Sequence, residues 1–92
     1  MAAGEEGRAL IVVVEDHPEM NAFICETLAD LYRVEPAFDG REGLEKVLEL
    51  RPDLVLSDVM MPELSGDTMV REIRARPELD AMPVVLLTAK GE

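Results

Sequence analysis

The sequence predicts an α/β fold in which helices cover both faces of an open, parallel sheet. Two observations lead to this prediction. Short β-branched apolar runs alternate with longer segments whose apolar residues recur at helical spacing. Their order is strand, helix, strand, helix, strand, helix, strand, which is typical of right-handed βαβ crossovers. The length of 92 residues fits one small domain with three layers, helix, sheet and helix.

The first two strands and the helix between them are expected within residues 9–36. Residues 9–14 are continuously apolar, as in a strand buried on both faces. From Pro18, a suitable residue for a first helical turn, the apolar residues follow a helical period. They predict one buried stripe, formed by Met20, Phe23, Ile24, Leu28 and Leu31. Residues 32–36 mix polarity and close with Pro36, which indicates an edge strand.

The second helix is expected to follow the Asp39-Gly40 turn. Asp39 and Glu42 have the spacing of a capping box, and Glu42 can pair with Lys46 on the exposed face. The predicted buried face consists of Leu44, Val47 and Leu48. Pro52 stops this helix, and residues 54–57 form the third predicted strand.

The last predicted elements are a third helix and a fourth strand. Ser65 is placed to cap the helix after a loop containing Pro62. Its inward residues are expected to be Met69, Val70 and Ile73. Pro83 then precedes the strand at residues 84–87, which is as apolar as an interior strand.

Composition and charge exclude several classes of partner. The chain has 20 acidic and 9 basic residues, a net charge of -11, which repels nucleic acids and anionic membrane surfaces. The longest apolar run has six residues, too short to cross a bilayer. The single Cys25 fits a reducing cytoplasm and is expected to be a buried, unreactive thiol. Residues 1–8 are expected to form a flexible leader, and residues 9–92 the domain.

Acidic residues and a hydroxyl stand where the predicted strands end. Glu15 and Asp16 follow the first strand, Asp58 the third and Thr88 the fourth. The carboxyl ends of parallel strands meet at one edge, where ligands usually bind. Such residues also cap helices or face water, but converging carboxylates favour a cation such as Mg²⁺. His17 could act as a further ligand or proton donor, although a loop or helix-start role is preferred.

Three motifs in this order resemble the receiver domain of two-component response regulators. They are Val-Val-Glu-Asp at residues 13–16, Ser-Asp-Val-Met-Met-Pro at residues 57–62 and Pro-Val-Val-Leu-Leu-Thr-Ala at residues 83–89. The resemblance extends from about residue 9 to residue 89, nearly the whole chain. It implies a flavodoxin-like fold with strand order 2-1-3-4.

The resemblance also implies a role for each site residue. Asp58 would accept a phosphoryl group from the phosphohistidine of a histidine kinase or histidine phosphotransfer domain. Glu15, Asp16 and Asp58, with the backbone carbonyl of Met60, would hold Mg²⁺. Thr88 would be the hydroxyl that turns toward the phosphoryl group and switches the conformation.

The sequence departs from the family pattern in two respects. Glu15 replaces the commoner aspartate, and its longer side chain is expected to reach the metal through water. The family continues through a fourth helix, a fifth strand and a fifth helix. The fifth-strand lysine of the family has no counterpart, because Lys90 stands too close to Thr88. We therefore expect a C-terminally truncated receiver whose fourth strand leaves an exposed edge that favours self-association.

The leading functional hypothesis is a phosphoacceptor module of a phosphorelay. It would assist its own phosphorylation without being a turnover enzyme, and a hybrid histidine kinase is the preferred parent protein. One alternative is a receiver-like interaction module that is not phosphorylated. Another is an Mg²⁺-dependent phosphotransfer enzyme, which is disfavoured because Met60 stands where such phosphatases usually carry a second aspartate.

Overall fold

The computed structural model describes residues 7–58, 66–79 and 81–87, and its strands form one parallel sheet. The strands in chain order are β1 (Leu10–Val14), β2 (Arg33–Ala37), β3 (Leu54–Asp58) and β4 (Val84–Leu87). Their order in the sheet is β2-β1-β3-β4, and every neighbouring pair is parallel. The predicted α/β class and the strand order 2-1-3-4 are confirmed.

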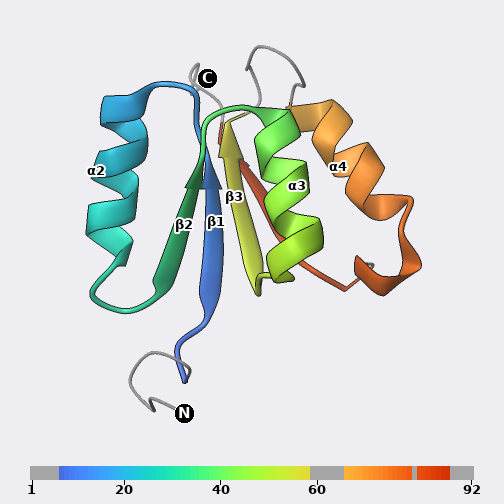
Figure 1. Ribbon diagram of the computed structural model, residues 1–92, viewed down its shortest axis with the longest axis horizontal. Helices are drawn as coiled ribbons and strands as arrows, with labels where there is room; N and C mark the ends of the chain where they lie inside the picture. Colours follow the sequence, from blue (N-terminus) through green and yellow to red (C-terminus); the bar gives the residue numbers. More distant parts are fainter. Residues whose placement is uncertain (1–6, 59–65, 80, 88–92) are drawn as a thin grey trace.

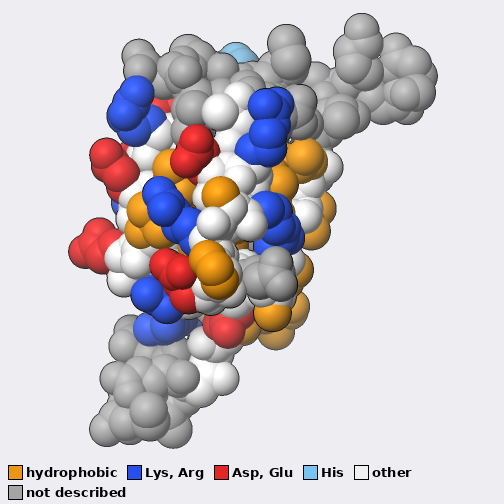
Figure 2. All heavy atoms as spheres, turned by 90° about the vertical axis from the view of Figure 1, so that its right-hand side faces the viewer, with side chains coloured by type: hydrophobic (Ala, Val, Ile, Leu, Met, Phe, Trp, Pro, Cys, Tyr) orange, Lys and Arg blue, Asp and Glu red, His pale blue; other side chains and the backbone are white. Residues whose placement is uncertain are grey.

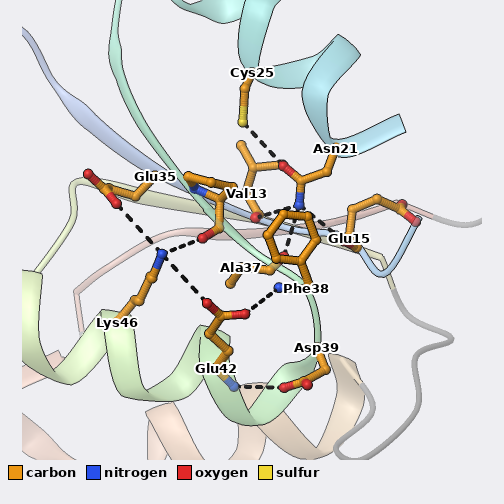
Figure 3. A network of polar contacts seen from close by, with 11 residues as sticks. Val13, Glu15, Asn21, Cys25, Glu35, Ala37, Phe38, Asp39, Glu42 and Lys46 are labelled. Carbon is orange, nitrogen blue, oxygen red and sulfur yellow. Dashed lines mark hydrogen bonds and ion pairs between the residues drawn. The ribbon is translucent and has the colours of Figure 1, made fainter. Parts of the chain in front are cut away.

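Helices lie on both sides of this sheet (Figures 1 and 3). They are α2 (Pro18–Leu28), α3 (Gly40–Leu50) and α4 (Gly66–Arg74), followed by the short 3₁₀ helix η1 (Pro77–Leu79). Helix α2 packs on β2 and β1 from one side, whereas α3 and α4 lie together on the other side. The three-layer arrangement is as predicted, while η1 was not predicted from the sequence.

The main core lies between the sheet and the pair of helices α3 and α4. Successive strand residues point to opposite faces, so Val12 and Val14 of β1 reach this core together. They belong to a buried cluster with residues of both helices, including Val47, Met69 and Ile73. Each of these three helical side chains is fully buried. Burying one such side chain contributes about 1.5–3 kcal/mol to stability, which explains why α3 and α4 stay on this face.

Helix α3 approaches β1 closely at Gly43. A Cβ atom placed on Gly43 would lie 2.8 Å from Cγ2 of Val14 and 3.0 Å from Sδ of Met69. The first distance is shorter than real Cβ contacts, and Val14 is fixed in the middle of the sheet. A side chain at position 43 would therefore push α3 away from the core.

Local signals set the ends of α3. The Asp39 carboxylate accepts a hydrogen bond of 2.8 Å from the Glu42 backbone N–H, as the predicted capping box requires. Glu42 reaches back to the Phe38 N–H, at 2.8 Å, and its carboxylate lies 3.7 Å from Lys46 Nζ. At the other end, Arg51 has a left-handed backbone with φ of 51°, which closes the helix before Pro52.

The buried stripe predicted for α2 is wrong. Met20 is 49% exposed, Phe23 is 65% exposed, and Leu31 is 70% exposed beyond the end of the helix. The buried residue of α2 is Asn21, while Ile24 and Leu28 are half-buried. The inward face is therefore rotated by roughly one residue from the predicted stripe. The physical reason is that the side chain of Asn21 donates hydrogen bonds to the backbone carbonyls of Glu15 and Ala37 at the end of the sheet, which apolar periodicity does not reveal.

Smaller corrections concern α3 and the strand ends. Leu48, predicted to be inward, is 36% exposed, whereas Leu44 packs against the core as expected. Strand β2 continues through Pro36 to Ala37, which is possible because β2 pairs only with β1 in the described sheet. Strand β3 includes Asp58 as its last residue.

Some predicted features lie outside the described residues. They are most of the leader at residues 1–6, the capping residue Ser65, and the site residues Met60 and Thr88. Within the described part of the predicted leader, Arg8 donates a hydrogen bond to the carbonyl of Ala29, at 3.1 Å.

Apolar side chains are exposed at the β4 side of the molecule. Val85 is 42% exposed and Leu86 is 36% exposed. Figure 2 views the molecule from the side of α4 and shows hydrophobic side chains at the surface among charged ones. None of the helices in the described part of the chain is long and apolar enough to span a bilayer.

Candidate functional site

Strand register brings the predicted acidic residues to one edge of the sheet. Val14, at the end of β1, is aligned with Ser57 of β3 and with Ala37 of β2. Glu15 and Asp16 follow Val14 directly, so they leave β1 beside Asp58, the last residue of β3. The strand register therefore places Glu15, Asp16 and Asp58 at the same edge of the sheet.

Glu15 is the more buried member of the acidic pair, with 7% of the residue exposed. Its backbone N–H donates to the carbonyl of Ala37 at 2.9 Å, which extends the pairing of β1 with β2. Its carboxylate oxygen Oε2 accepts a 3.1 Å bond from the His17 N–H, just before the first turn of α2. The N-terminus of a helix favours negative charge, so Glu15 is held in a suitable place for a carboxylate.

Asp16 contributes a buried carboxylate oxygen to the site. Its Oδ1 atom is buried and has no hydrogen-bond partner among the described residues. Nδ1 of His17 lies 3.5 Å from this oxygen. A buried carboxylate oxygen without a partner lowers stability, and a bound cation would remove that cost. Ligand atoms of Glu15, Asp16 and His17 all lie within 4.8 Å of one another, so these carboxylates fit a hard divalent cation such as Mg²⁺.

His17 has a larger part in this site than the sequence indicated. It is the N-cap residue of α2, which agrees with the preferred helix-start role, and its side chain is 78% exposed. Its Nδ1 also lies 3.1 Å from Oε2 of Glu15. This hydrogen bond, followed by the charge of Asp16, raises the pKa of His17 above its usual value of 6.5. The imidazolium and a metal ion would therefore contact the same carboxylates.

Asp58 is half-buried at the end of β3. The preceding residue, Ser57, is fully buried, and its hydroxyl donates a 2.8 Å hydrogen bond to the backbone carbonyl of Asp58. This bond restrains the backbone from which the carboxylate projects. The other two predicted site residues, Met60 and Thr88, are not among the residues whose placement the structure describes.

Sequence reasoning missed Asn21, which contacts the backbone of the site. Its side-chain nitrogen Nδ2 lies 2.9 Å from the carbonyl of Ala37 and 3.0 Å from that of Glu15 (Figure 3). Its Oδ1 accepts a hydrogen bond from Cys25 Sγ, at 3.3 Å. The sequence contained one signal for the contact with Cys25, since Asn21 stands four residues before it in a predicted helix.

Cys25 is less buried than predicted, and its unreactive character remains a prediction. It is half-buried, and burial raises its pKa, with a smaller contribution from the charge of Glu35. The charge of Lys46 acts in the opposite direction, an effect not anticipated from the sequence, but does not reverse the shift. A raised pKa keeps the thiol protonated, and the protonated form is a poor nucleophile.

Comparison with known proteins identifies the family. The model of the response regulator receiver domain matches residues 11–92, which include every strand and helix described above except Leu10, the first residue of β1. The chain belongs to the response regulator receiver family. The sequence resemblance and the fold are therefore both confirmed for this receiver domain.

Relatives of this receiver domain include whole signalling proteins and isolated receivers. Hybrid signal transduction histidine kinase D of Dictyostelium discoideum is 49% identical over 85 residues, which are 92% of this chain and 6% of that protein. The chemotaxis response regulator CheY4 of Vibrio cholerae has a solved structure with a TM-score of 0.87 and 34% identity, covering 92% of this chain and 72% of that one.

A third similar protein is described with a metal ion. The receiver domain of sensor histidine kinase PA1611 of Pseudomonas aeruginosa was solved with a magnesium ion coordinated in its active-site cleft. It has a TM-score of 0.85 and 34% identity, over 90% of this chain and 69% of that one. This chain thus spans only a small part of the hybrid kinase and about two thirds of the solved receivers.

Proposed function

We propose that this receiver domain accepts a phosphoryl group on Asp58 from a phosphohistidine. The donor would be a histidine kinase or a histidine phosphotransfer domain. The observation that carries the proposal is the buried Oδ1 of Asp16, which has no hydrogen-bond partner among the described residues and lies at the sheet edge where Asp58 ends β3. Such an oxygen favours a cation, and a cation beside Asp58 suits phosphoryl transfer. Hybrid kinases among the relatives support membership of a phosphorelay.

The proposed reaction transfers one phosphoryl group between two side chains. A carboxylate oxygen of Asp58 attacks phosphorus in line with the bond to the donor's imidazole nitrogen. The new P–O bond forms as the P–N bond breaks, and its electron pair stays on the imidazole, which then takes up a proton. The product is an acyl phosphate on Asp58. The protein's part is to position Asp58 and to lower the repulsion between the carboxylate and the incoming phosphoryl oxygens.

Glu15, Asp16 and Asp58 are the described residues that would hold Mg²⁺, together with the carbonyl of Met60. When bound, the ion supplies positive charge to the phosphoryl oxygens in the transition state. Asp16 is the stronger candidate for direct contact, since its Oδ1 has no hydrogen-bond partner among the described residues. Glu15 already accepts a hydrogen bond from the backbone of His17, which favours contact through water. The magnesium-bound receiver of PA1611 supports this assignment.

The remaining parts of the proposal concern the switch residue, the bounds of the domain and its cellular location. Thr88 would turn its hydroxyl toward the phosphoryl group and so report phosphorylation. Residues 9–92 would form the receiver and residues 1–8 a leader. We also propose a cytoplasmic location. Cys25 is the single cysteine of this sequence and cannot form a disulfide within it, which fits a reducing compartment.

Phosphorylation of the full-length protein tests the proposed function. A phosphorylated histidine donor with Mg²⁺ should label the protein with a base-labile phosphoryl group. Asp58→Asn should abolish labelling and keep the fold, because the amide is nearly isosteric with the carboxylate. Asp30→Asn is the matched control, since Asp30 is exposed after the end of α2 and should leave labelling unchanged. Labelling that persists in Asp58→Asn would place the acceptor elsewhere, and a folded protein that is never labelled would favour the unphosphorylated interaction module.

A further inference from the structure

Asn21 joins α2 to the ends of two strands at the candidate metal site. The residue is 1% exposed, and its Nδ2 faces three backbone carbonyls, those of Ala37 at 2.9 Å, Glu15 at 3.0 Å and Val13 at 3.4 Å (Figure 3). A carboxamide nitrogen carries two hydrogens, so the two shorter contacts are the hydrogen bonds that it can make with good geometry. One side chain thus bridges the carboxyl ends of β1 and β2.

The contacts of Asn21 also fix which way its amide points. Oδ1 accepts a hydrogen bond from Sγ of Cys25, one turn later on α2. In the opposite orientation, Oδ1 would face the carbonyl oxygens of Glu15 and Ala37, where no hydrogen is available. The carboxamide therefore has a single orientation that satisfies both of its ends.

This bridge restrains the backbone that carries both acidic side chains. The N–H of Glu15 donates to the carbonyl of Ala37, and the carbonyl of Glu15 accepts from Asn21. The peptide group is planar, so holding the Glu15 carbonyl also fixes the plane that extends to the Cα of Asp16. The directions in which the side chains of Glu15 and Asp16 project from the backbone therefore depend on Asn21 of α2.

We propose that Asn21 is a positioning residue for the metal site. It acts through the Glu15 carbonyl to aim the carboxylates of Glu15 and Asp16, and it does not touch the ion. The inference rests on the proposed function, because it assumes that these carboxylates bind Mg²⁺. Groups that orient metal ligands commonly affect metal affinity by 10–100-fold when removed.

Mg²⁺ affinity separates this role from a merely structural one. We expect Asn21→Ala in the full-length protein to bind Mg²⁺ about tenfold more weakly, measured by amide NMR titration of the folded protein. Two controls keep the bridge intact. Val47→Ala removes a fully buried side chain on the other side of the sheet and should lower stability without changing Mg²⁺ affinity. Cys25→Ala removes the contact to Oδ1 only and should also retain the affinity.

The outcomes distinguish failure of this inference from failure of the proposed function. If the wild-type protein binds no Mg²⁺ at Glu15, Asp16 and Asp58, the proposed function fails. If the wild-type protein binds and a folded Asn21→Ala binds equally well, Asn21 is structural and the inference is wrong. An equal loss of Mg²⁺ affinity in Val47→Ala would also overturn the inference, because the weaker binding would then be a general effect of lower protein stability.

If Asn21→Ala does not fold, a measurement on the wild-type protein tests whether Asn21 positions the metal site. The two side-chain amide proton signals of Asn21 should shift during the Mg²⁺ titration with the same midpoint as the backbone amide of Asp16. A shared midpoint would support the coupling between α2 and the site. Side-chain signals that stay unchanged while the Asp16 amide shifts would overturn it.

Discussion

The imidazole of His17 lies beside the two carboxylates that also suit a metal ion. Nδ1 is 3.1 Å from Oε2 of Glu15 and 3.5 Å from Oδ1 of Asp16. The hydrogen bond to Glu15 raises the pKa of His17, which favours the protonated imidazole near neutral pH. Its positive charge partly balances the negative charge of Glu15 and Asp16. The residue that the sequence placed at a helix start therefore also takes part in the electrostatics of the site.

The first prediction concerns the titration of His17 in the metal-free protein. Its pKa should lie above 6.5, chiefly because of the hydrogen bond to Glu15. The charged form is favoured in the folded state, so its stabilising contribution is complete below pH 6.5 and is lost as pH rises through the folded pKa. That contribution should be small, since the side chain is 78% exposed.

NMR can follow this titration directly, because His17 is the single histidine of the chain. Glu15→Ala should lower the pKa of His17 toward its usual value. The control Glu19→Ala removes an exposed carboxylate from the first turn of α2 and should have little effect. A wild-type pKa at or below 6.5 would contradict the prediction.

At the level of elements, the sequence predicted strands better than helix faces. Strand β4 has the predicted bounds, and β1 and β3 end within one residue of them, because continuous apolar runs mark buried parallel strands. The parallel order then placed Glu15, Asp16 and Asp58 at one edge. The face of α2 was predicted wrongly, since periodicity counts apolar residues and cannot show that backbone carbonyls require the amide of Asn21.

The second prediction concerns the N-terminus of α3. Asp39→Ala removes the carboxylate that accepts from the Glu42 N–H and should lower the free energy of unfolding by about 1 kcal/mol. Urea denaturation measures this loss. Asp30→Ala provides a control, because it removes an exposed aspartate outside the helices and should leave the midpoint nearly unchanged. Equal midpoints for Asp39→Ala and the wild type would show that the cap contributes little.

For the whole molecule, the β4 side differs from the rest of the sheet. Strand β1 has a neighbour on each side, whereas β4 pairs only with β3 in the described sheet. Val85 and Leu86 of β4 remain exposed, although the sequence of this strand is apolar throughout. Because Val85 and Leu86 are 42% and 36% exposed, each forgoes part of the roughly 1.5–3 kcal/mol that full burial would contribute. An open strand edge with exposed apolar residues favours contact with another chain.

The third prediction follows for a polypeptide of these 92 residues alone. It should form dimers or larger species in sedimentation experiments. Val85→Lys should shift the population toward monomer, because it places a charge on the exposed strand. Leu50→Lys changes an exposed leucine at the end of α3 and should not alter the association. A wild-type polypeptide that stays monomeric and melts sharply would refute this reading of β4.

The strand order has a consequence for how the domain forms during synthesis. Strand β1 is made first, but both of its neighbours, β2 and β3, are complete once Asp58 has been added. A chain grows at about 5–20 residues per second, slowly enough for early segments to pair before later ones have emerged from the ribosome. The three strands and the carboxylates of Glu15, Asp16 and Asp58 can therefore assemble on the ribosome first. Helix α4 and β4 then dock onto an edge that is already built.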